Sequence, residues 1–122
     1  MEVLMDYKDL LVWQESMDLA VKVYELAKKL PKEEIYVLSD QIRRAAVSIP
    51  SNIAEGQNRN TPKEFIQFLY IALGSASELE TQLLLVQKLN YLSNISEELK
   101  QTLKIRKMIN ALIGSVRRKN GL

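Results

Sequence analysis

The sequence predicts an all-α fold, a bundle of four helices that run up, down, up and down. Leu, Ala, Glu, Lys and Gln are abundant in the 122 residues, whereas Gly (4) and Pro (3) are scarce, which favours long helices. Apolar residues recur at three- and four-residue steps along most of the chain. The predicted helices span about residues 9–29, 33–57, 62–89 and 96–118. Because short loops join them, sequential helices should pack antiparallel within a single domain, residues 1–122.

The first helix, residues 9–29, carries two neighbouring apolar rows. The row that we expect to face the core consists of Leu10, Trp13, Met17, Ala20, Tyr24 and Ala27. The second row consists of Val12, Leu19, Val23, Leu26 and Leu30. So broad an apolar arc is typical of a helix with two packed neighbours. Pro31 ends the helix, because the residue before a proline is pushed away from helical angles.

The second helix, residues 33–57, is expected to be kinked at Pro50. Its predicted inward residues are Ile35, Leu38, Ile42, Ala45, Ala46, Ile49 and Ile53. They stay in phase past Pro50, which indicates one helix and not two, although a proline in a helix interior costs roughly 3 kcal/mol. Gly56 and Asn58 tolerate left-handed angles and should close this helix.

The third helix, residues 62–89, has the clearest start. Thr61 is a predicted N-cap, Pro62 suits the first helical position, and Glu64 completes a capping box. Its predicted core residues are Phe65, Phe68, Leu69, Ala72, Ala76, Leu79, Leu83 and Val86. The small residues at 74–77 should let another helix approach closely.

The fourth helix, residues 96–118, follows a break at residues 90–95. Asn94 with Glu97, or Ser96 alone, is expected to cap it. Its predicted core residues are Ile105, Ile109, Leu112 and Val116.

Missing residue types exclude much chemistry. The chain contains no Cys and no His, so thiol nucleophiles, imidazole bases, disulfides and the usual zinc sites are excluded. The first nine residues lack the pattern of a secretory signal, and no apolar run approaches membrane-spanning length. We therefore expect a cytoplasmic, non-enzymatic protein with no cofactor, no metal, no small-molecule substrate and no membrane partner.

Positive charge is concentrated in the last segment. Residues 1–95 hold ten Lys/Arg and thirteen Asp/Glu, whereas residues 96–122 hold seven and two. Four cations lie near one line of the fourth helix: Lys100, Lys104, Lys107 and Arg118. Such a row can neutralise the phosphates of RNA or DNA. A solvated helix face explains it equally well, because no aromatic residues are interleaved.

Adjacent arginines in the second helix suggest ion pairs. Asp40 precedes Arg43 and Arg44 by three and four residues, the spacing of an intrahelical pair. If the second and third helices are antiparallel, Arg43 lies level with residues 77–78, and a bridge to Glu78 or Glu80 is the second hypothesis.

Outward-facing residues of the second helix are candidates for a subunit contact. They are Arg44, Ser48, Ser51 and Glu55. No histidine or lysine accompanies the serines, so a catalytic role is disfavoured. Surplus apolar residues on the flank of the third helix also favour a homo-oligomer: Ile66, Tyr70, Leu73 and Leu84.

Three stretches, residues 7–34, 38–59 and 63–83, closely resemble one protein family. The segment IPSNIAEG (49–56) and the preceding RRAA (43–46) are its most specific parts. The chain resembles, over about residues 7–92, the bacterial four-helix-bundle proteins encoded within intervening sequences of large-subunit ribosomal RNA genes. The resemblance implies a left-handed bundle that forms ring-shaped pentamers. It also implies kinship with an accessory protein of diversity-generating retroelements, which works with a reverse transcriptase and binds nucleic acid through a basic surface.

Two functions follow as expectations. The first is an oligomeric helical scaffold that contacts nucleic acid, or a nucleic-acid enzyme, through its Lys/Arg cluster. The alternative is a structural or protein-interaction module with no nucleic-acid role.

Overall fold

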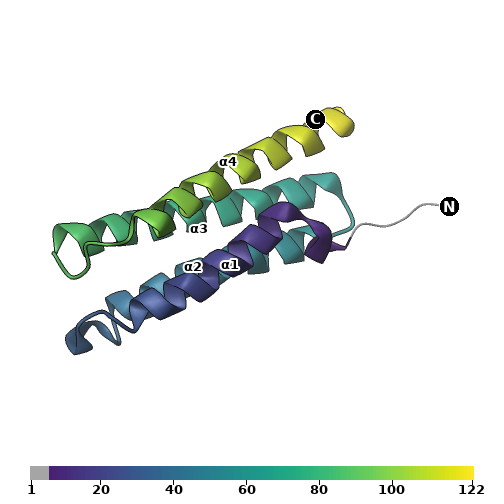
Figure 1. The fold of residues 1–122 in the computed structure, drawn as a ribbon. Helices are drawn as coiled ribbons and strands as arrows, with labels where there is room; N and C mark the ends of the chain where they lie inside the picture. Colours follow the sequence, from purple (N-terminus) through teal and green to yellow (C-terminus); the bar gives the residue numbers. More distant parts are fainter. Residues whose placement is uncertain (1–5) are drawn as a thin grey trace.

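The computed structural model describes residues 6–122, and almost all of them lie in helices (Figure 1). The long helices are α1 (Leu11–Ala27), α2 (Leu38–Gln57), α3 (Pro62–Lys88) and α4 (Ser96–Lys119). Two short 3-10 helices, η1 (Tyr7–Asp9) and η2 (Lys32–Glu34), precede α1 and α2. No strand occurs within residues 6–122, so the predicted all-α class with four helices is confirmed. Residues 1–5 lie outside the described part of the chain. They belong to the segment that we predicted not to be a secretory signal.

Four helix-to-helix seams enclose one hydrophobic core. The helices pack as α1 on α2, α2 on α3, α3 on α4 and α1 on α4 (Figure 1). All four contribute side chains to a single buried cluster, for example Leu19, Ile49, Leu79 and Ile109. Burial of such side chains is the main favourable term in folding. No helix within residues 6–122 has both the length and the apolar character needed to cross a bilayer.

The predicted core row of α1 is buried only in part: Ala20 and Ala27 are 9% and 4% exposed, but its larger side chains are not buried. The second row is the buried one: Val12, Leu19, Val23, Leu26 and Leu30 are each at most 7% exposed. In the first row Met17 and Tyr24 are both 42% exposed, and Trp13 is only partly buried. Because the rows are adjacent on the helix, only the positions of α2 and α4 decide which row enters the core.

The start of α2 lies five residues later than predicted. Val37, with φ −119° and ψ −92°, departs from helical angles just before Leu38. Ile35, predicted to point inward, is 44% exposed. From Leu38 the helix continues without interruption through Pro50 to Gln57, as the in-phase pattern predicts. Its other six predicted inward residues are buried.

Gly56 serves close packing and not a left-handed turn. Among residues 6–122 only Asn90 and Gly121 have positive φ, so the predicted left-handed close of α2 is wrong. A Cβ added at Gly56 would lie 2.6 Å from Cβ of Phe68 on α3. Glycine is therefore required because α3 passes too close for a side chain.

The start of α3 follows the sequence closely, whereas that of α4 does not. The Glu64 N–H donates to Oγ1 of Thr61 at 3.2 Å, and Pro62 is the first helical residue. At the other end Asn90, with φ 58°, closes α3 in the left-handed conformation that asparagine tolerates. Ile95 occupies the N-cap position of α4 with no side-chain hydrogen bond, so the predicted polar cap is absent; its side chain is buried in the core instead.

Candidate functional site

Three of the four predicted nucleic-acid contacts share one surface of α4. Lys100, Lys104 and Lys107 line a shallow hollow of about 420 Å³, together with Leu103 and Met108. Arg118 lies eleven residues beyond Lys107, about 16 Å along the helix, and is not part of this lining. We call Lys100, Lys104 and Lys107 the lysine row.

Carboxylates of α1 neutralise part of the lysine row. Lys104 Nζ donates to Glu15 Oε1 at 2.8 Å. The side-chain amide of Gln101 donates to Asp18 at 2.9 Å and to Glu15 at 3.2 Å. The hydrogen bond from Lys104 lowers the pKa of Glu15, and that from Gln101 lowers the pKa of Asp18. Each carboxylate is thereby held in its charged form.

A second lysine extends this network along the α1–α4 seam. Lys22 Nζ lies 2.9 Å from Glu97 Oε1 and 3.3 Å from Asp18 Oδ2. The hydrogen bond to Glu97 raises the pKa of Lys22. Residues separated by about 75 positions meet here, so no local spacing in the sequence could reveal the network. Lys100 and Lys107, in contrast, form no ion pair within 4.0 Å in the described part of the chain.

The predicted ion pairs of α2 are formed only in part. Arg44 Nε lies 2.9 Å from Asp40 Oδ2, which is the intrahelical pair expected at this spacing. Arg43 has no carboxylate within 4.0 Å anywhere in residues 6–122, so the predicted bridge to Glu78 or Glu80 is not formed. Glu80 lies 3.0 Å from Nη1 of Arg106, because this side of α3 faces α4.

Glu78, the other predicted partner of Arg43, accepts a hydrogen bond from Nε2 of Gln82 at 3.2 Å. Glu78 is therefore bound by a residue of α3, and Glu80 by a residue of α4. The relative positions of α2 and α3 along the chain do not predict these partners.

Three of the four predicted subunit-contact residues, Arg44, Ser51 and Glu55, are exposed, and Ser48 is half-buried. Ser48 is turned into the α2–α3 seam, where its hydroxyl lies 2.7 Å from that of Ser75. Glu55 is bound by Arg59 at 2.8 Å, and Arg44 by Asp40. Ser51 lines a groove between α2 and α1. A subunit contact through Arg44, Ser51 and Glu55 therefore stays a prediction.

That groove between α1 and α2 is lined mainly by apolar side chains. It measures about 610 Å³ and is lined chiefly by Trp13, Met17, Tyr24, Val47 and Pro50. The ring of Tyr7 meets that of Trp13 edge to face at 5.4 Å and closes one end. These α1 residues belong to the row that we predicted to be core, so the sequence revealed their apolar character but not their exposure.

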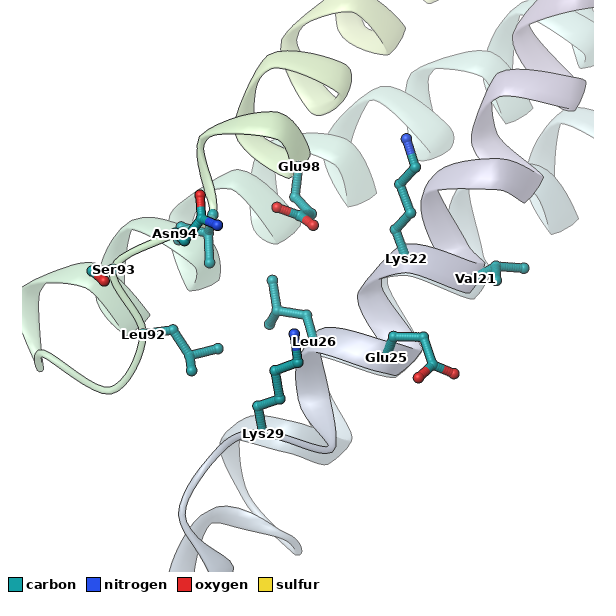
Figure 2. Close-up of a pocket in the computed structure, with 10 residues that line it drawn as sticks. Val21, Lys22, Glu25, Leu26, Lys29, Leu92, Ser93, Asn94 and Glu98 are labelled. Carbon is teal, nitrogen blue, oxygen red and sulfur yellow. The ribbon is translucent and has the colours of Figure 1, made fainter.

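A smaller pocket lies between α1 and the loop that leads into α4 (Figure 2). It measures about 360 Å³, with Leu26 and Ile95 among its apolar lining and Lys29 and Glu98 among its charged lining. Oε1 of Glu98 is buried and has no hydrogen-bond partner within residues 6–122. The pocket can therefore accept a hydrogen-bond donor.

Neither hollow contains a recognisable catalytic set. No group of three or more His, Cys, Asp or Glu side chains that could hold a metal ion occurs among residues 6–122. Near the smaller pocket, Tyr91 donates its hydroxyl to Glu34 at 2.7 Å, and this hydrogen bond raises the pKa of Tyr91. The phenol is thus held protonated.

Comparison with known proteins identifies the family. Residues 8–111 match the family described as 23S rRNA-intervening sequence protein. A crystal structure from Bacteroides thetaiotaomicron, of a protein with unknown function from the S23 ribosomal protein family, is similar with a TM-score of 0.79 and 30% sequence identity. The match covers 84% of this chain and 98% of that one. No curated protein matches this chain. The chain therefore belongs to the 23S rRNA-intervening sequence protein family, in agreement with the resemblance of its RRAA and IPSNIAEG segments.

Proposed function

We propose that this protein is a non-enzymatic helical scaffold that assembles with further copies of itself through the groove between α1 and α2. The groove is the observation that carries this proposal. Its lining includes Val21, Met17, Tyr24 and Val47, which are 63%, 42%, 42% and 41% exposed. Large contiguous apolar surfaces of this kind mark interaction sites in soluble proteins.

A second apolar surface on the same chain supports an assembly of identical subunits. The tip between η2 and α2 exposes Ile35, Tyr36 and Val37 by 44%, 92% and 55%. When two different patches of one chain meet head to tail, the contacts generate a ring if the rotation closes. This arrangement agrees with the pentamer that the family resemblance implies.

Light scattering on the purified protein tests the assembly. At tens of micromolar we expect a mass several times the 14.0 kDa of one chain, and five times that value for a pentamer. Met17→Glu combined with Val47→Glu should yield monomers with unchanged helical circular dichroism. Leu85→Glu, at a site on α3 that is 43% exposed, is the matched control and should leave the assembly intact. A monomeric wild-type protein would refute the proposal, and dissociation by the control alone would place the contact on α3.

We also propose a specific topology for the four helices. We infer a left-handed up-down-up-down bundle, supported by short connections and by packing between helices that follow one another in the chain. We also infer a kink in α2 at Pro50, because proline removes the backbone donor that would pair with Ala46. A crystal structure in which α2 is straight on both sides of Pro50 would refute the kink.

Contact with RNA or DNA, or with an enzyme that acts on them, is the second part of the proposed function. The excess of cations in residues 96–122 supports it. We therefore expect the protein to act in the cytoplasm, where such partners occur. Salt titration of binding compares the wild type with Lys100→Ala/Lys104→Ala/Lys107→Ala/Arg118→Ala, which should bind more weakly and with a smaller salt dependence. Absence of binding in both proteins at 50 mM salt would favour the alternative, a structural or protein-interaction module.

A further inference from the structure

We propose that the nucleic-acid contact lies at the end of the bundle where α2 turns into α3 and α4 terminates, and not on the lysine row. This inference rests on the proposed contact with nucleic acid and assigns its site and its chemistry. We call the following side chains the basic end: Arg59, Lys63, Arg117, Arg118 and Lys119. Of these five residues, the sequence predicted only Arg118 to contact nucleic acid, as one of four cations that included the lysine row.

Two segments far apart in the sequence meet at the basic end. Arg59 and Asn60, from the α2–α3 turn, line a hollow of about 360 Å³ together with Lys119 and Asn120 at the end of α4. The guanidinium of Arg59 lies 4.8 Å from the ring centre of Phe68 and is bound by Glu55. Arg117 Nη2 donates to the hydroxyl of Tyr70 at 3.0 Å. Aromatic side chains therefore hold two of the arginines in place.

Charge balance separates the basic end from the lysine row. Residues 55–64 and 114–122 hold five positive and two negative side chains, and one of the negative ones, Glu55, is bound by Arg59. Adjacent η1 and its N-cap residue add Lys8, Asp9 and Asp6, and both aspartates accept hydrogen bonds from backbone N–H groups. Around the lysine row, by contrast, nearby carboxylates are paired with lysines: Glu15 with Lys104, and Asp18 and Glu97 with Lys22. Net positive charge, and not the number of lysines, attracts a polyanion.

Helix stability accounts for three of the five cations of the basic end but not for Lys63. Cations in the last turn of α4 are favoured by the negative end of the helix dipole, which is a sufficient reason for Arg117, Arg118 and Lys119. Lys63 lies in the first turn of α3, where the positive end of the dipole disfavours a cation. Lys63, four residues after Arg59, is exposed and forms no ion pair within residues 6–122, so it is available to an external anion.

The side-chain types suit the sugar–phosphate backbone. Guanidinium groups bind phosphate through two parallel hydrogen bonds, which an ammonium cannot do. Three of the five cations of the basic end are arginines, whereas the lysine row has none. The amides of Asn60 and Asn120 add hydrogen-bonding groups of the kind that contact phosphate and sugar oxygens. We therefore assign the backbone of a nucleic acid as the partner, read without base specificity.

Two variants that remove equal charge test this assignment by fluorescence anisotropy. The end variant is Arg117→Gln/Arg118→Gln/Lys119→Gln, and the row variant is Lys100→Gln/Lys104→Gln/Lys107→Gln. Probes are a labelled 20-nucleotide single-stranded RNA and RNA and DNA duplexes of equal length, titrated at 50 to 200 mM salt. We expect the end variant to lose about tenfold or more in affinity and to lower the slope of log K against log salt by about 2 to 3. The row variant should change affinity less than about threefold.

A second end variant guards against a folding effect, because Arg117 contacts Tyr70. Arg59→Gln/Lys63→Gln leaves that contact intact and should also weaken binding, with unchanged circular dichroism. A larger loss in the row variant would overturn the site but leave the proposed function standing. No binding by the wild type would overturn both, and binding only to vesicles that contain anionic lipid would replace nucleic acid by a membrane surface.

Discussion

The α2–α3 seam is stabilised by close packing, whereas the edge of the α1–α4 seam is stabilised by ion pairs. The helices α2 and α3 approach so closely that position 56 has no room for a side chain larger than that of glycine. The hydroxyls of Ser48 and Ser75 lie 2.7 Å apart across the same seam. Along the edge of α1–α4, long charged side chains reach across, as in the Lys104 to Glu15 pair. The first seam depends on volume and the second on charge, so different perturbations should separate them.

Close packing accounts for the small and apolar residues of the RRAA and IPSNIAEG segments. RRAA and IPSNIAEG belong to α2, and their residues Ala45, Ala46, Ile49, Ile53 and Gly56 are all buried. Small residues at defined positions are needed where α3 approaches, so close packing constrains this stretch. No comparable constraint acts on the exposed network between α1 and α4.

The largest effect should follow from adding one methyl group to the close seam. Gly56→Ala would place its Cβ 2.6 Å from Cβ of Phe68, so α2 and α3 must separate locally. We expect a loss of about 1–3 kcal/mol in the free energy of unfolding, measured by urea denaturation. Gly74→Ala is the matched control, because nothing lies within 4 Å of its Cβ; it should stabilise α3 by about 0.5–1 kcal/mol. Equal effects of the two substitutions would contradict the close approach.

The next largest effect concerns the hydroxyl pair in the same seam. Ser48→Ala removes the partner of the Ser75 hydroxyl and one acceptor of the Asn52 amide. We expect a loss of about 1 kcal/mol. Ser48→Ala/Ser75→Ala should cost less than the sum of the single changes, since no hydroxyl is left unpaired. Strict additivity in this double-mutant cycle would show that the two hydroxyls do not interact.

The α1–α4 pairs should contribute less and should respond to salt. A double-mutant cycle on Glu15 and Lys104, whose side chains are 30% and 59% exposed, should give a coupling of about 0.2–1 kcal/mol at low ionic strength. At 1 M salt the coupling should shrink, because the Debye length falls to about 3 Å. The Ser48–Ser75 coupling is the internal control and should be insensitive to salt. A coupling in the α1–α4 pair that survives 1 M salt would argue against a screened ion pair.

The smallest effect should be a pH dependence confined to the charged seam. The pKa of Glu15 is below its ordinary value of 4.5, and that of Asp18 below 3.8. Their stabilisation is complete above the ordinary pKa values and is lost as the pH falls through the lowered ones. The pKa of Lys22 is raised above 10.5, so its contribution is lost only as the pH rises past that value.

Thermal unfolding between pH 2.5 and pH 12 measures this dependence. The chain has no histidine, so stability should be level near neutral pH. Gln101→Ala/Lys104→Ala should flatten the acid limb, because it removes the hydrogen bonds that lower the pKa of Glu15 and Asp18. An acid limb identical to that of the wild type would assign the pH dependence to other carboxylates.

The sequence by itself determined the local features of the fold. The all-α class, the start of α3 at Thr61 and Pro62, the break at Asn90 and the continuity of α2 through Pro50 all follow from periodicity, capping and backbone preference. Each of these signals depends only on residues that are close together in the sequence. The Asp40 to Arg44 pair was predictable for the same reason, since it spans one helical turn.

Only the tertiary structure decided which of several suitable residues meet. It buried one apolar row of α1 and left Trp13, Met17 and Tyr24 to line a groove. In it, Glu80 pairs with Arg106 and not with Arg43. It also places the α2–α3 turn next to the end of α4. Such choices depend on the relative placement of helices, which nearest-neighbour patterns do not encode. The charge of a surface likewise depends on what another helix brings beside it: Glu15 neutralises Lys104 from 89 positions away, and the basic end remains positive because no helix supplies it with enough carboxylates.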